Sequence, residues 1–194
     1  KIAINTYVTT KISYANMLSD VCQHLEGADV DVVTQAVGVD SRIGGKYLKA
    51  GVAFGGPCFP RDNIAFSSLA RKIGAKADIA HATQEINKHQ NHRLQALIEK
   101  YSKTNKIGIL GLAYKPGTSV VEESQSIHIA NQLSEKGYKV TVYDPMALGE
   151  ASKVLVKDIH FAASTQECLE SSDTILIMTP WPTFAKELTP SLLQ

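Results

Sequence analysis

The sequence predicts an α/β protein in which a helical N-terminal half precedes a Rossmann-like domain of three layers around a parallel sheet. Two observations lead to this prediction. The N-terminal half spaces its apolar residues as helices do, and the C-terminal half alternates short apolar strands with helices. The period changes in a polar stretch at 102–105, so we expect a helical domain over 1–103 and an α/β domain over 104–194.

Helices dominate the first half. Residues 2–25 contain neither proline nor glycine, and because no capping residue precedes them we expect the native chain to continue upstream. Asp29 is a candidate N-cap for a second helix that ends at Gly38. Asp62 is expected to cap a third helix over 64–73, and a long helix covers about 78–101. A helix over 2–25 would leave an apolar face in water, so we expect it to form a homodimer.

The second half contains three apolar runs, 106–112, 139–143 and 174–178, separated by a helix over 124–135 and a short helix over 167–170. This alternation predicts parallel strands joined by crossovers. Gly108 and Gly111 do not form a G-x-G-x-x-G fingerprint, so they are either structural glycines or nucleotide contacts. In such a sheet a ligand is expected at the carboxyl ends of the strands, near 113–118 and Asp144.

Composition and charge exclude several classes of protein. Of 194 residues, 44% are hydrophobic and 20% charged, which excludes a disordered chain. A net charge of +1 leaves no excess of basic residues that would bind nucleic acid or a membrane surface. No apolar run reaches the ~20 residues of a membrane span. Three cysteines and no signal peptide indicate a cytoplasmic protein without disulfides.

The loop over 41–61 is rich in glycine and proline, and a long loop of this kind is usually functional. It leads into Phe54–Asp62, which reads FGGPCFPRD. Cys58 lies just before a predicted helix, where the helix dipole and Arg61 favour the nucleophilic thiolate. Asp62 could cap that helix or handle a proton and water. A buried cysteine in a glycine turn is the alternative.

The other candidate ligands give weaker signals. Cys22 and Cys168 fall on helical patterns and are expected in the core. The six histidines show no metal-ligand pattern, so we expect no metal site.

The segment FGGPCFPRD resembles the catalytic-cysteine motif of the UDP-glucose 6-dehydrogenase (UDP-glucose/GDP-mannose dehydrogenase) family. The resemblance covers nearly the whole chain. Lys1 and Asn5 look like the family's lysine–asparagine pair, DSRIG at 40–44 like its substrate loop, and GLAYKP at 111–116 like the start of its UDP-sugar domain. The segments 143–145 and 179–184 look like its later strand ends, and 40–62 is more similar to the UDP-glucose branch than to the UDP-N-acetylmannosamine branch.

The resemblance implies a central dimerisation domain and a UDP-sugar-binding domain, with the family's N-terminal NAD-binding Rossmann domain absent from these residues. The implied reaction oxidises the 6-hydroxyl of UDP-glucose to UDP-glucuronate in two hydride transfers to NAD. Cys58 would carry a thiohemiacetal and then a thioester. Lys1 and Asn5 would stabilise the oxyanion, and Asp62 would position the hydrolytic water.

Binding residues follow from the same resemblance. Arg42 would reach the substrate diphosphate across a dimer interface. The other implied substrate contacts are Tyr47, Lys49, Phe54, Gly55, Tyr114 and Lys115. The implied cofactor contacts are Cys58, Phe59, Pro60 and Arg61, together with Glu122, which stands where the family has an arginine that touches NAD.

The residues leave three hypotheses. The chain is part of an NAD-dependent UDP-sugar dehydrogenase, or it is a non-catalytic, dimeric UDP-sugar-binding remnant, a possibility that Glu122 favours because a carboxylate repels a pyrophosphate. The third is an unrelated cysteine enzyme on an α/β scaffold.

Overall fold

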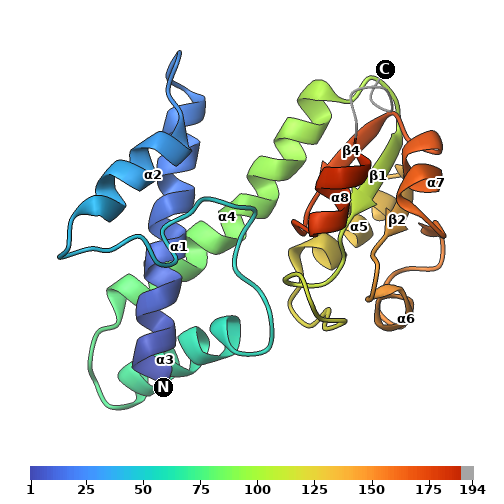
Figure 1. Ribbon diagram of the computed structural model, residues 1–194. Helices are drawn as coiled ribbons and strands as arrows, with labels where there is room; N and C mark the ends of the chain where they lie inside the picture. Colours follow the sequence, from blue (N-terminus) through green and yellow to red (C-terminus); the bar gives the residue numbers. More distant parts are fainter. Residues whose placement is uncertain (189–194) are drawn as a thin grey trace. The chain divides into compact units, whose positions relative to one another are not determined.

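The computed structural model describes residues 1–188 and confirms the α/β class (Figure 1). The chain forms two compact units, Lys1–Leu94 and Gln95–Gln194, which divide within helix α4 (Asp78–Tyr101). The first unit contains α1 (Ile2–Gln23), α2 (Val30–Val39) and α3 (Phe59–Lys72), followed by the first part of α4. Asp29 caps α2 as predicted, because its carboxylate accepts hydrogen bonds from the Asp31 and Val32 amides.

Most of the buried side chains of α1 are polar, and Ala15 and Cys22 are buried with them. Thr6, Thr9, Ser13 and Asn16 face the interior, where α1 packs against α2 and α3. The hydroxyl of Ser13 donates to the Thr83 carbonyl on α4 at 3.2 Å, so hydrogen bonds as well as apolar contacts join these helices.

Several large apolar side chains of α1 are exposed on another side of the helix. We call this set the apolar stripe; its members are Ile4, Tyr7, Tyr14 and Val21, which are 44 to 68% exposed. Their spacing of three and seven residues keeps them on one face of the helix, as in the seam of a coiled coil. The stripe therefore contributes nothing to the core of this unit.

The second unit is built on a parallel sheet with strand order β3-β2-β1-β4. Its strands are β1 (Lys106–Leu110), β2 (Lys139–Tyr143), β3 (His160–Phe161) and β4 (Thr174–Ile177). Its helices after α4 are α5 (Gln125–Glu135), α6 (Leu148–Ala151), α7 (Thr165–Glu170) and α8 (Pro182–Glu187). The chain moves one way along the sheet through α5 and back through α7. Right-handed crossovers therefore place these two helices on opposite faces, giving three layers (Figure 1).

The glycines of β1 and its carboxyl end serve packing. A Cβ on Gly108 would lie 2.5 Å from Ile175 Cδ1, and one on Gly111 would lie 2.5 Å from Thr179 Cβ. Gly111 also has a φ of +94°, a conformation that other residues rarely adopt. These contacts favour the structural interpretation of both glycines.

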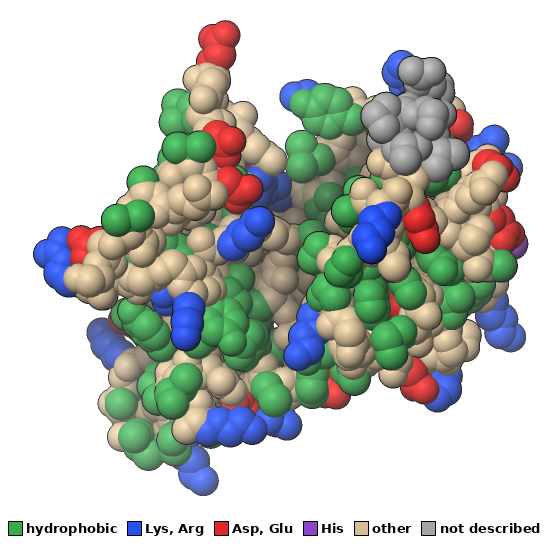
Figure 2. All heavy atoms as spheres, in the orientation of Figure 1, with side chains coloured by type: hydrophobic (Ala, Val, Ile, Leu, Met, Phe, Trp, Pro, Cys, Tyr) green, Lys and Arg blue, Asp and Glu red, His purple; other side chains and the backbone are tan. Residues whose placement is uncertain are grey.

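Several further sequence predictions can be compared with the structure. Cys22 and Cys168 are buried, as expected. The strand β3 and the helices α6 and α8 were not predicted, because two to six residues are too few to show a period. Lysine and arginine side chains are scattered over the face shown in Figure 2. Among residues 1–188, no helix has both the length and the apolar character needed to cross a membrane.

Candidate active site

Cys58 occupies the N-cap position of α3 and is partly exposed. The helix begins at Phe59, three residues before the predicted cap, so the prediction that Asp62 caps a helix over 64–73 is wrong. Pro60 explains the earlier start, because its fixed φ and missing N–H suit the first turn of a helix. Asp62 instead lies inside that turn, and its amide donates to the Cys58 carbonyl at 2.8 Å.

The Asp62 carboxylate connects α1 to the cysteine turn. It accepts a hydrogen bond from Asn5 Nδ2 at 2.7 Å, and its other oxygen accepts from Arg61 Nε and Nη2, each at 3.2 Å. Arg61 Nη2 also lies 3.9 Å from Cys58 Sγ. The amide of Asn5 lowers the pKa of Asp62, and the charges of Arg61 and Lys1 lower it further against the opposing effect of burial. The structure thus brings together side chains from sequence positions 5 and 58–62.

Two buried amides hold the segment that leads to the cysteine. Asn87 on α4 accepts from the Phe54 amide at 2.9 Å and donates to the Phe54 carbonyl at 3.0 Å. Asn16 on α1 accepts from the Gly51 amide at 2.8 Å. These side chains supply hydrogen-bond partners to the backbone of a segment without regular structure, as a neighbouring strand does in a sheet. Sequence reasoning missed both, since a single asparagine within a helix gives no signal of its distant partner.

The remaining expected residues of the first unit lie on the loop between α2 and α3. Arg42 is highly exposed and pairs with Asp40, with Nη2 2.6 Å from Oδ2. The ring centroid of Tyr47 lies 6.3 Å from that of Phe59 in an edge-on arrangement. Lys49 lines a cavity of about 480 Å³ beside α2.

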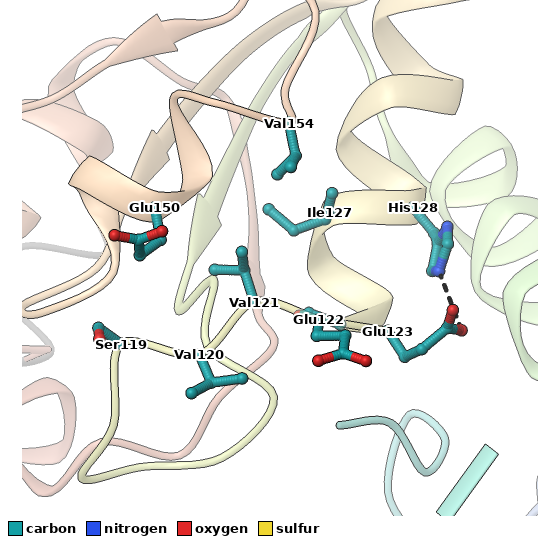
Figure 3. Close-up of a pocket in the computed structure, with 10 residues that line it drawn as sticks. Ser119, Val120, Val121, Glu122, Glu123, Ile127, His128, Glu150 and Val154 are labelled. Atoms are coloured by element: carbon teal, nitrogen blue, oxygen red, sulfur yellow. Dashed lines mark ion pairs between the residues drawn. The ribbon is translucent and has the colours of Figure 1, made fainter. Parts of the chain in front are cut away.

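In the second unit, the expected substrate and cofactor contacts lie on the segment between β1 and α5. The ammonium of Lys115 lies 5.5 Å from the centroid of the neighbouring Tyr114 ring. Glu122 lines a pocket of about 500 Å³. Figure 3 shows Val121, Ile127 and Val154 near the middle of this pocket, with Glu122, Glu123 and Glu150 around them.

Asp144, at the carboxyl end of β2, has a structural role in this unit. It is 1% exposed, and its oxygens accept N–H groups at 2.7 to 3.1 Å from Leu112, Ala113, Met146, Ala147 and Trp181. These bonds tie together the loops that follow β1, β2 and β4. The expectation of a ligand near Asp144 is therefore not supported by this carboxylate, whose two oxygens are already used.

Comparison with known proteins decides the family. Residues 1–89 match the central domain of the UDP-glucose/GDP-mannose dehydrogenase family, and residues 108–193 match its UDP binding domain. The chain belongs to this family. The UDP-glucose 6-dehydrogenase TuaD of Bacillus subtilis is 38% identical to this chain over 185 residues, which are 94% of this chain and 40% of that protein.

Solved structures agree. A UDP-glucose dehydrogenase from Pyrobaculum islandicum superposes with a TM-score of 0.89 at 36% identity, covering 95% of this chain and 43% of that one. A UDP-D-ManNAc dehydrogenase from Pyrococcus horikoshii shares the fold, with a TM-score of 0.79 at 22% identity over 99% of this chain and 44% of that one. The chain thus spans about two fifths of the length of these dehydrogenases.

Proposed function

We propose that this chain is the part of an NAD-dependent UDP-sugar dehydrogenase that supplies the nucleophile and most of the substrate site. The substrate is UDP-glucose and the product UDP-glucuronate. The observation that carries the proposal is the cluster of Cys58, Arg61, Asp62 and Asn5, in a chain 38% identical to a UDP-glucose 6-dehydrogenase. The lower identity of 22% to the UDP-D-ManNAc enzyme is consistent with UDP-glucose as the sugar nucleotide.

The thiol makes the second oxidation possible. The cofactor NAD, when bound, accepts one hydride from C6 of the sugar in each oxidation. After the first, Sγ of Cys58 adds to the aldehyde carbon and forms a thiohemiacetal. Loss of the second hydride from the same carbon, and of the hydroxyl proton, leaves a thioester. Water then attacks the thioester carbon, which releases the carboxylate product and the free thiol.

The neighbouring side chains suit these steps. The guanidinium of Arg61 lies 3.9 Å from Sγ, so its positive charge faces the reacting sulfur. Asn5 uses one amide N–H for Asp62 and has a second available for an oxyanion, with Lys1 one helical turn away on the same face. Asp62, whose pKa is lowered, stays an anion and can accept a hydrogen bond from the hydrolytic water.

The two groups of proposed cofactor residues differ in how well they fit NAD. Phe59 and Pro60 follow the thiol directly, and Arg61 offers a cation for an anionic cofactor. Glu122 fits poorly, because it shares its pocket with Glu123 and Glu150, and these carboxylates repel a pyrophosphate. We therefore assign the contact with NAD to Phe59–Arg61, and we assign Glu122 no contact with NAD.

The proposed assembly is a homodimer through α1. The apolar stripe exposes four large side chains on one helix face, and a second copy of α1 would cover them. Arg42, on the exposed loop after α2, would then reach the diphosphate in the partner's site.

The second candidate function is a UDP-sugar-binding remnant without dehydrogenase activity. The acidic pocket at Glu122 favours it, since it removes one expected NAD contact. The Cys58–Asp62 cluster argues against it, because sugar binding alone needs no thiol beside a guanidinium.

One experiment separates the two candidates. The longest native form of the protein is mixed with UDP-glucose and NAD, and NADH is followed by absorbance. We expect about two NADH for each sugar, lost in Cys58→Ala and kept in the control Cys22→Ala, whose thiol is buried away from this cluster. Absence of NADH, with UDP-glucose still protecting Cys58 from iodoacetamide, would indicate the binding remnant. Absence of both signals would reject the proposed function.

A further inference from the structure

We propose that Lys11 is a positioning residue that holds the loop carrying Arg42 against α1 for UDP-sugar binding. The inference rests on the proposed function, because the loop's task is taken from it. The ammonium of Lys11 donates to the Ile43 carbonyl at 3.0 Å and to the Gly44 carbonyl at 2.8 Å. Thirty-two and thirty-three residues of sequence separate these partners from Lys11.

The loop that carries Arg42 is a turn closed by hydrogen bonds between its own residues. The Asp40 carbonyl accepts from the amides of Ile43 and Gly44, each at 2.9 Å. The Asp40 carboxylate accepts from the amide and the guanidinium of Arg42 at 2.6 to 3.2 Å. These bonds fix the shape of the turn and the direction of Arg42 within it. The turn follows α2 directly, since Asp40 is the C-cap of that helix, and Lys11 adds hydrogen bonds that join it to α1.

The position of Lys11 on α1 links the loop to the proposed dimer. Lys11 follows Tyr7 by four residues and precedes Tyr14 by three, so it lies on the apolar stripe. A lysine in such a seam is unfavourable unless its ammonium finds acceptors. Here the two carbonyls of the loop accept its protons, and the aliphatic stem can pack with the tyrosines. Lys11 therefore shares a helix face with the stripe and donates hydrogen bonds to the turn that presents Arg42.

This arrangement predicts that Lys11→Met changes UDP-glucose binding and self-association in different ways. The substitution of a purely structural residue would weaken both together. Methionine keeps an unbranched stem of similar length and removes the ammonium. The stripe then becomes continuously apolar, so self-association should be maintained or strengthened. The loop loses its connection to α1, so UDP-glucose binding should weaken. A residue needed only for stability would instead lower the unfolding midpoint and leave the affinity of the folded protein unchanged.

The test compares four forms of the chain: wild type, Lys11→Met, the conservative Lys11→Arg, and the control Lys46→Met, which removes the same charge from a neighbouring exposed position. Calorimetric titration with UDP-glucose should give a Kd about tenfold higher for Lys11→Met. Lys11→Arg should restore binding to within about threefold, since its guanidinium can also donate to two carbonyls. Lys46→Met should bind as wild type does. Light scattering should show an undiminished assembly for Lys11→Met.

A second measurement does not depend on the substrate. Trypsin cuts after arginine, and the exposed Arg42 lies in the turn, so release of the turn should speed cleavage after Arg42 at least severalfold in Lys11→Met, measured by mass spectrometry. If wild type binds no UDP-glucose, the proposed function fails and this cleavage rate alone tests the connection. Wild-type affinity and wild-type cleavage in Lys11→Met would overturn the inference. If that variant does not fold, Lys11→Gln, whose shorter amide cannot reach both carbonyls, gives the same comparison.

Discussion

Replacing Asp144 with asparagine should destabilise the second unit far more than any change in volume would suggest. The substitution is nearly isosteric, but it turns one acceptor oxygen into an N–H₂ donor. Each carboxylate oxygen of Asp144 faces backbone donors: Oδ1 accepts from Met146 and Ala147, and Oδ2 accepts from Leu112 and Ala113. Either orientation of the new amide therefore points donors at donors and leaves at least two N–H groups unpaired.

The magnitude follows from the number of donors left without an acceptor. A buried donor that loses its partner costs about 1–3 kcal/mol, and the lost bonds are charge-assisted. Two such donors give roughly 4 kcal/mol in the free energy of unfolding. With a denaturant slope of about 2 kcal/mol per molar urea, the unfolding midpoint should fall by about 2 M.

The protein contains one tryptophan, which provides the assay. Trp181 donates from Nε1 to Asp144 Oδ2 at 3.1 Å, so its fluorescence reports the unfolding of this unit. Urea titrations followed by tryptophan emission should be run on wild type, Asp144→Asn and the control Asp173→Asn. The control carboxylate is exposed and accepts one hydroxyl, from Thr104 at 2.7 Å, so its midpoint should stay within about 0.3 M of wild type. Equal midpoints for the two variants would refute the reasoning that Asp144 holds the three loops together.

Four further results are expected. Gly111→Ala should lower the free energy of unfolding by about 3 kcal/mol or more in the same assay, because its φ is +94° and the new methyl would lie 2.7 Å from the Thr179 amide nitrogen. Burial raises the pKa of the Cys168 thiol to about 11, so iodoacetamide at pH 8 should label Cys58 and spare Cys168 by peptide mass. The raised pKa also means that stability present below the ordinary thiol pKa is lost as the pH rises toward 11. Tyr14→Glu should convert the proposed dimer to monomer in light scattering, because it buries a charge in the apolar stripe.

Matched variants control for these results. Gly149→Ala adds a methyl that meets no other part of the chain within 4 Å, so it should not lower the free energy of unfolding. Tyr101→Glu places the same charge at an exposed tyrosine outside the apolar stripe, and the assembly should be unchanged. A stable Gly111→Ala variant, prompt labelling of Cys168, or a Tyr14→Glu dimer would each contradict the corresponding argument.

Local chemistry explains why parts of the fold were predictable. The strands predicted over 106–112 and 139–143 and the helix over about 78–101 follow from apolar patterns within a few residues, and the structure contains them, with the first strand ending at Leu110. The helix at Cys58 was placed too late, because Asp62 looked like a cap while Pro60 gave the competing and correct signal. The apolar pattern of α1 predicted a helix, but it did not predict that threonine, serine and asparagine make up most of its buried side chains.

The sequence by itself determined the α/β class, the family resemblance and the cysteine segment with Arg61 and Asp62, because these depend on residue type and spacing along a short stretch. Only the tertiary structure decided the partners of isolated polar residues: Asn5 with Asp62, Asn87 with Phe54, and Lys11 with the Arg42 loop. The physical reason is that an amide or ammonium at least partly removed from water is stabilised by pairing, but many distant groups could pair with it. Packing of the helices selects the one that comes within hydrogen-bonding distance.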